Sequence, residues 1–235
     1  METMANILDR LRGKPSFDPT KVHYLHIGKT AGNQIKTVCK QIEELDPRIR
    51  FELHSHGTHL YRLPDAARYF FSIRHPVTRF KAGFYERKRQ GRNGGNFWSE
   101  HERMSFEVFQ DAADLAEVLF DKSQQGELAR SSMHSIQHVR KTHFTWFHPH
   151  GHFLTARPPV WILRQENFEA DLETFSQRLG LDGPPDGRAD AYRGKITDYS
   201  EIPELSAKGV KNLERWYSAD IAFYEDCSRW LDKYN

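Results

Sequence analysis

The feature that most constrains this chain is a hydrophobic segment that ends in a glycine-containing loop and runs directly into a helical pattern. Residues 22–27 (VHYLHI) are mostly β-branched, aliphatic or aromatic, which is typical of a buried strand. From about Asn33 apolar residues recur at helical spacing, and Pro47 ends the pattern. A strand, a short loop and a helix in this order predict the first half of a βαβ unit.

The remaining strand and helix signals alternate along the chain. Strands are predicted at 51–53, 69–73 and 160–163, and helices at 76–89, 105–120, 128–139, 167–179, 205–217 and 218–231. This alternation predicts an α/β fold, a single domain with a central, mainly parallel sheet and helices on both faces. Ligands of such sheets bind at the carboxyl ends of the strands, which singles out residues 28–34 and 74–79.

Composition excludes several classes of protein. Among 235 residues, 34 are Lys or Arg and 32 are Asp or Glu, so the chain lacks the basic excess of a non-specific nucleic-acid binder. No apolar run approaches the roughly 18 residues of a membrane span. Cys39 and Cys227 are too few for a disulfide framework, and residues 1–20 look like a short leader without a signal peptide. We therefore expect a cytoplasmic protein, and nothing here specifies an oligomeric state.

The loop after the first strand, Gly28-Lys29-Thr30-Ala31-Gly32, has the composition of a phosphate-binding turn. Backbone N–H groups at a helix start attract anions, the glycines permit close approach, and the lysine and threonine add a charge and a hydroxyl donor. A complete nucleoside-triphosphate P-loop needs a further glycine at the position of His23. A P-loop-like turn therefore stays open beside the plainer alternative, a tight turn with a solvated lysine.

A second segment makes the pattern more specific. Residues 26–32 (HIGKTAG) resemble the H-I-P-K-T-A-G loop, and residues 74–80 (RHPVTRF) the R-D-P-x-x-R-F segment, of sulfotransferases that use 3′-phosphoadenylyl sulfate (PAPS). The nearest branch is the carbohydrate sulfotransferases, including the uronyl 2-O enzymes and their bacterial relatives. Residues 164–171 and the closing helices also resemble this family, so the likeness runs from Val22 to Trp230.

The resemblance implies a sulfotransferase domain over residues 21–235 and a set of donor-binding residues. These are Gly28, Lys29, Thr30, Ala31, Gly32, Asn33, Gln34, Arg74 and Ala82, with Arg193 or Lys195 from the late loop as helpers. The chain departs from the family pattern at four places. Gly28 replaces a proline, Asn33-Gln34 replaces Thr-Ser, His75 replaces an aspartate, and Ala82 replaces a serine that holds the 3′-phosphate.

Thirteen histidines include two clusters, His54/His56/His59 and His148/His150/His152. Either cluster offers metal ligands by spacing, but no cysteines or paired carboxylates accompany them, so we expect no metal. A histidine, with an ordinary pKa of about 6.5, also suits a general base. Residues 54–56 resemble the H-x-H of the uronyl enzymes and residues 56–58 the H-x-T of the bacterial ones. Both alignments select His56, with His54 second and Glu52 the next candidate.

The resemblance implies transfer of a sulfuryl group from PAPS to an acceptor hydroxyl, expected on a carbohydrate, by in-line displacement without a metal. Lys29 would stabilise the departing oxygen, His56 would take the acceptor proton and Arg74 would hold the 3′-phosphate. Residues 87–101 and 146–158 carry Arg, His and aromatic side chains suited to a polar acceptor. Two alternatives remain: a P-loop-like ATP-dependent kinase, and a non-catalytic module that binds anionic sugars or nucleotides.

Overall fold

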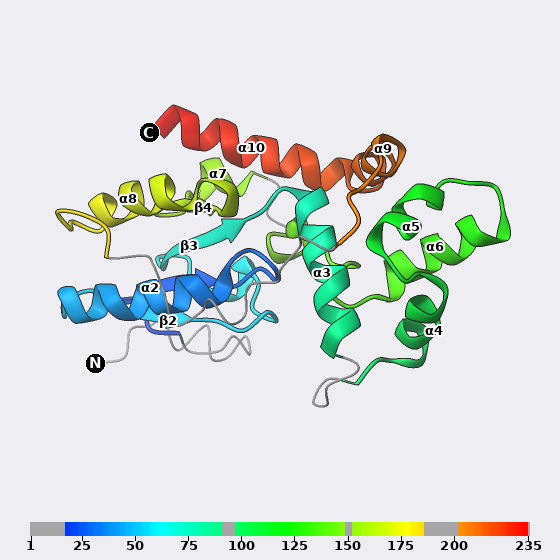
Figure 1. The fold of residues 1–235 in the computed structure, drawn as a ribbon. Helices are drawn as coiled ribbons and strands as arrows, with labels where there is room; N and C mark the ends of the chain where they lie inside the picture. Colours follow the sequence, from blue (N-terminus) through cyan, green and yellow to red (C-terminus); the bar gives the residue numbers. More distant parts are fainter. Residues whose placement is uncertain (1–16, 91–96, 149–151, 186–201, 235) are drawn as a thin grey trace. The chain divides into compact units, whose positions relative to one another are not determined.

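A parallel sheet forms the centre of the fold. The structure, a computed structural model, describes residues 17–90, 97–148, 152–185 and 202–234. The described strands form one four-stranded sheet in the order β2-β1-β3-β4, and every neighbouring pair is parallel (Figure 1). The strands are β1 (Val22–Leu25), β2 (Phe51–Leu53), β3 (Arg68–Ile73) and β4 (Ile162–Arg164). The predicted α/β class with a central parallel sheet is confirmed.

The contacts of the chain group into two compact units. The first takes in Met1–Ile73, His143–Gly194 and Asp226–Asn235, and therefore contains the whole sheet. The second takes in Arg74–Thr142 and Lys195–Glu225 and is helical. No helix among the described residues is long and apolar enough to cross a membrane.

In the first unit, aromatic side chains cover both faces of the sheet. Adjacent residues of a strand point to opposite faces, so Phe70 and Phe71 of β3 pack in different layers. Phe70 lies 4.6 Å, between ring centroids, from Phe175 of α8, and Phe71 lies 4.6 Å from Phe147. The helical elements of this unit are α2 (Gly32–Leu45), η1 (Leu60–Arg62), η2 (His143–Trp146), α7 (Phe153–Ala156), η3 (Gln165–Asn167), α8 (Phe168–Arg178) and the end of α10 (Ser218–Tyr234).

The helix after β1 follows directly from its sequence pattern. Ile35, Val38 and Ile42 of α2 are fully or almost fully buried and recur at the spacing that brings them onto one helix face. The helix ends at Leu45, two residues before Pro47, whose ring disfavours helical backbone at the intervening Asp46. The helix starts one residue before the predicted position. Ile35, Val38 and Ile42 form the predicted buried stripe, but Leu45, which was expected to continue it, is 63% exposed.

The second unit is a cluster of helices around aromatic side chains. Its helices are α3 (Pro76–Gln90), α4 (Glu100–Val108), α5 (Ala112–Val118), α6 (Gln124–Ser135), α9 (Ala207–Trp216) and the beginning of α10. The prediction of one helix from Ser105 to Phe120 was wrong. Ser99 is the N-cap that begins α4, and Ser105 is buried inside that helix. Phe109 is extended and Asp111 begins α5, so the chain turns between two shorter helices.

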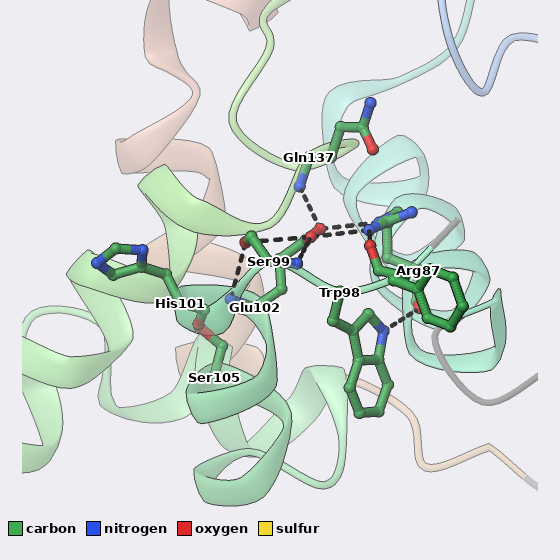
Figure 2. Close-up of polar contacts among 8 residues, drawn as sticks. Arg87, Trp98, Ser99, His101, Glu102, Ser105 and Gln137 are labelled. Atoms are coloured by element: carbon green, nitrogen blue, oxygen red, sulfur yellow. Dashed lines mark hydrogen bonds and ion pairs between the residues drawn. The ribbon is translucent and has the colours of Figure 1, made fainter. Parts of the chain in front are cut away.

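A buried ion pair ties α3 to α4 (Figure 2). The Nη2 of Arg87 donates to Glu102 at 2.7 Å and its Nε donates at 2.8 Å, and both side chains are almost completely buried. Burial raises the pKa of Glu102, but hydrogen bonds from Arg87 and from the backbone N–H groups of Gln137 and Ser99 outweigh it and lower the pKa. Arg87 was expected to face an acceptor, and its guanidinium is instead committed to this pair.

We predict that Glu102→Gln destabilises the protein by about 3–5 kcal/mol, the usual result of leaving a buried charge without its partner. Glutamine keeps the size of the side chain, so the effect reports the lost charge and not a cavity. Urea denaturation measures the change in the free energy of unfolding. Glu100→Gln on the exposed surface of the same helix is the control, with an expected change within about 0.5 kcal/mol. Equal effects of the two substitutions would contradict the importance of the pair.

Candidate functional site

The strand order creates a switch point at the carboxyl end of β1. From β1 the chain passes through α2 to β2 on one side of β1, and it later enters β3 on the other side. Loops that leave two adjacent parallel strands in opposite directions open a crevice, which is where ligands of α/β sheets bind. The segment that follows β1, residues 26–31, occupies this place in the first unit.

A chain of hydroxyl groups fixes that loop to the sheet. Thr30 donates to the carbonyl oxygen of Ile27 at 2.8 Å, because a carbonyl can only accept. The Ser72 hydroxyl of β3 lies 2.7 Å from that of Thr30 and therefore donates to it, and Tyr24 of β1 donates to Ser72 at 2.9 Å. Burial raises the pKa of Tyr24, which keeps it a donor. The hydroxyl of Thr30 was expected to face a phosphate, and it serves the loop instead.

Two residues of the loop have left-handed backbone. Lys29 has a φ of 70° and Ala31 a φ of 66°, a conformation that costs a residue with a Cβ roughly 1–2 kcal/mol. Gly28 and Gly32 were expected to allow close approach of the backbone, and the left-handed residues Lys29 and Ala31 lie directly beside them. Left-handed residues in a turn direct successive N–H groups towards one point, as anion-binding turns do. Such strain is retained where the surrounding structure enforces it, often at functional sites.

The N-terminus of α2 carries a positive field without a side-chain cap. Its N-cap, Ala31, has no side chain that accepts a hydrogen bond, and the first turn contains no acidic residue. The first N–H groups of a helix have no partner within the helix, and they lie at the positive end of its dipole. The predicted donor-binding residues Gly32, Asn33 and Gln34 form this first turn. The arrangement is suited to an anionic ligand.

His26 packs directly against the start of α2. A Cβ on Gly32 would lie only 1.9 Å from Nε2 of His26, so the imidazole occupies the space that any other residue would need. Burial lowers the pKa of His26 to about 3, and positive charge from His56, Lys36 and Lys29 adds to the effect. Four basic residues from three segments of the first unit are therefore gathered here. His26 and Lys36 were not among the site residues predicted from the sequence.

His56 is exposed and held in one orientation. Its Nδ1 lies 3.0 Å from the carbonyl oxygen of His26, and the two ring centroids are 3.9 Å apart. Because the carbonyl can only accept, Nδ1 donates and the neutral ring carries its lone pair on Nε2. Trp146, buried, donates its indole N–H to the carbonyl oxygen of His56 at 3.2 Å. Trp146 was expected to line an acceptor site, and it holds the backbone of His56 instead.

The second candidate base, His54, lies in a different environment. It is 6% exposed, and its Nε2 lies 2.9 Å from Nδ1 of His23 on β1. Burial first and the neighbouring His23 second lower the pKa of His54 to about 4, and Glu52 opposes the shift. His56 is therefore accessible from solvent, whereas His54 faces another imidazole.

The remaining predicted donor residues belong to the second unit or lie outside the described residues. Arg74, which directly follows β3, donates from Nε to the hydroxyl of Thr78 at 3.2 Å, and Thr78 donates to the carbonyl oxygen of His75 at 3.0 Å. Ala82 is buried within α3. Arg193 and Lys195 fall outside the described residues, as does His150 of the second histidine cluster.

A second arginine expected to line an acceptor site also has a structural role. Arg157 donates from Nη1 to the carbonyl oxygen of Leu60 at 3.2 Å, and from Nη2 to that of Pro64. Its guanidinium also lies over the ring of Tyr69, 5.6 Å from the centroid. These contacts tie the segment after α7 to the turn around η1.

No known family model, curated protein or solved structure matches this chain.

We predict that Gly32→Ala destabilises the protein by about 1–3 kcal/mol, because the added Cβ collides with the ring of His26. In a His26→Ala background the same substitution should have no cost or be mildly stabilising, since alanine favours helix over glycine by roughly 0.5–1 kcal/mol. Chemical denaturation of the four proteins gives the coupling between the two sites. Gly183→Ala, where no atom lies within 4 Å of the new Cβ, is the control. Additive effects would show that the two residues do not compete for space.

Proposed function

We propose that this protein transfers a sulfuryl group from 3′-phosphoadenylyl sulfate to an acceptor hydroxyl, with a carbohydrate as the acceptor class. The observation that carries the proposal is the gathering of Lys29 and His56 around His26, beside the uncapped start of α2. A cation, an anion-binding helix terminus and an oriented imidazole are the groups that sulfuryl transfer to an alcohol needs. The resemblance of residues 26–32 and 74–80 to the PAPS-dependent family supports the same activity.

The proposed reaction is an in-line displacement at sulfur. The acceptor oxygen forms a bond to sulfur while the bond from sulfur to the oxygen bridging it to phosphate breaks. The electron pair of that bond stays with the departing phosphate oxygen of adenosine 3′,5′-bisphosphate, where Lys29 and the first N–H groups of α2 stabilise the charge. The acceptor proton passes to Nε2 of His56, which carries the lone pair in the neutral ring.

The hydrogen bond from Nδ1 of His56 to the backbone determines that Nε2 is the nitrogen that accepts the proton. When Nε2 takes a proton the ring becomes cationic, and the carbonyl oxygen of His26 accepts from the Nδ1–H of that cation. His26 itself has a pKa of about 3 and stays neutral, so it adds no charge that would oppose protonation of its neighbour. On this proposal His26 is a positioning residue: it sets the orientation of His56 and fills the space above Gly32.

We predict that the donor site selects for the 3′-phosphate through Arg74. In calorimetry, wild-type protein should bind adenosine 3′,5′-bisphosphate much more tightly than AMP or ATP. Arg74→Met should weaken bisphosphate binding by about 10- to 100-fold, the usual effect of losing a charge-assisted hydrogen bond, and should leave AMP binding unchanged. Arg140→Met, an exposed arginine of the same unit, is the control. Equal weakening for both nucleotides would exclude the assignment, and magnesium-dependent binding of ATP would indicate a kinase.

We predict that Lys29 acts on the transition state more than on binding. Lys29→Met should lower kcat on the order of 10²–10³-fold, as expected for a lost oxyanion stabiliser, while the bisphosphate Kd changes only a few-fold. Methionine keeps the length of the side chain and does not relieve the left-handed backbone, as glycine would. Lys36→Met removes the other lysine near His26 and is expected to affect donor KM rather than kcat. Loss of binding with unchanged kcat in Lys29→Met would make Lys29 a binding residue alone.

We predict that His56 is the general base. His56→Ala should reduce turnover by about 10²–10⁴-fold and leave bisphosphate affinity intact, because the imidazole serves the acceptor. His59→Ala, a partly exposed histidine on the same segment, is the matched control and should retain near-normal turnover. Normal turnover in His56→Ala would move the base to His54, and to Glu52 if His54→Ala also retains turnover. Bisphosphate binding without any sulfated product would indicate a non-catalytic binding module.

A further inference from the structure

Two side chains of the first two strands and one from the residue after β2 converge at a place that the proposed reaction does not use. His23 of β1 and Glu52 of β2 are direct partners in the parallel ladder. His54 lies two residues beyond Glu52, and residues two apart in an extended chain point to the same side. The ligand atoms of the two imidazoles and the carboxylate all lie within 4.8 Å of one another. The strand register thus brings together a His₂Glu set that sequence spacing did not reveal.

The separations are close to those of a metal site. Nδ1 of His23 lies 2.9 Å from Nε2 of His54 and 3.9 Å from Oε2 of Glu52. Nitrogen and oxygen ligands about 2.0–2.2 Å from a tetrahedral Zn²⁺ are about 3.3–3.5 Å from each other. The two distances from His23 differ from this range by about half an ångström, and the separation of His54 from Glu52 is at most 4.8 Å. Side-chain movements of up to about 1 Å therefore bring all three atoms to bonding distance of one ion.

Hydrogen bonds outside the triad orient two of its members. Nε2 of His23 lies 2.9 Å from the carbonyl oxygen of Asp18, so Nε2 donates and the lone pair of the neutral ring is on Nδ1, towards His54. The backbone N–H of Asp18 donates to Oε2 of Glu52 at 3.4 Å. Metal-binding histidines characteristically donate their second N–H to a backbone carbonyl in this way. One residue, Asp18, thus fixes both an imidazole and a carboxylate.

The two imidazoles are shielded from solvent. His23 is completely buried and His54 is 6% exposed. The ring of Phe17 lies edge-on to them, with its centroid 4.7 Å from that of His54. The side chain of Glu52 is 26% exposed and connects the group to solvent. The two nitrogen ligands are therefore shielded from water, and the group is open to solvent on the side of the Glu52 carboxylate.

We propose that His23, Glu52 and His54 bind a single Zn²⁺ ion, with water completing the coordination. Without metal, the Nε2–H of His54 donates a hydrogen bond to Nδ1 of His23. When the ion binds, it takes the place of this hydrogen, and the proton of His54 moves from Nε2 to Nδ1 of the same ring. Both rings therefore stay neutral. Bound there, the ion joins β1 to the end of β2 and fixes the segment that leads into residue 56. This site is separate from the proposed sulfuryl transfer and does not depend on it.

The test is calorimetric titration of the full chain with Zn²⁺ after treatment with a chelator. Wild-type protein should bind one ion per chain, and its Tm should rise with Zn²⁺ concentration because the ion binds only the folded state. Glu52→Gln keeps the shape of a partly exposed side chain and should weaken binding at least tenfold and abolish the rise in Tm. His54→Gln should do the same. Mg²⁺ should not compete, because it prefers oxygen ligands.

His59→Gln is the matched control, since it removes a nearby histidine from the same segment but none of the three ligands. It should bind Zn²⁺ like the wild type. The proposal is overturned if the wild type binds no Zn²⁺ at micromolar concentration, or if Glu52→Gln binds it with unchanged affinity and the same rise in Tm. If His54→Gln does not fold, Glu52→Gln alone decides between these results. Weakened binding in His59→Gln with normal binding in Glu52→Gln would show that surface histidines hold the ion.

Discussion

The hydrogen-bond chain from Tyr24 through Ser72 and Thr30 to Ile27 holds the candidate site in place. It joins two adjacent strands of the first unit to the loop between β1 and α2, and all four groups are buried. A buried hydroxyl without a partner is costly, so this chain penalises any movement of the loop away from the sheet. Its rigidity is what allows Lys29 and Ala31 to keep left-handed backbone that would otherwise relax.

His26 is the second element on which the site depends, and its role is packing rather than charge. Its imidazole fills the space above Gly32 and contacts the ring of His56, while its backbone carbonyl accepts from the same residue. Because the buried ring of His26 is neutral, Lys29, Lys36 and His56 lie near it without an additional positive charge from His26. The positive field at this place therefore comes from the lysines and the uncapped start of α2.

The first and second candidate bases, His56 and His54, have different surroundings in the structure. His54 and His56 lie two residues apart, but His54 turns into the protein towards His23 and Glu52, and His56 is exposed beside His26. The same segment thus supplies a candidate base on one side and a candidate metal ligand on the other. The arginines expected to face an acceptor show a similar change of role, because Arg87 pairs with Glu102 and Arg157 binds backbone carbonyls.

The sequence by itself determined the strands, the order of strand, loop and helix around residue 28, and the stripe of α2 that is buried. These follow from local periodicity and from turn-forming residues, which act over a few neighbours. The tertiary structure alone decided that Gly32 accommodates His26 and that Ser72 of β3 bonds the hydroxyl of Thr30. The start of a helix at Ser99 instead follows from a local capping box with Glu102, which the sequence contains. The first two features depend on which residues compete for the same space or hydrogen bond in the folded chain. For His23 and His54, the register of β1 against β2 determines that the two side chains meet, and this register exists only once the chain has folded.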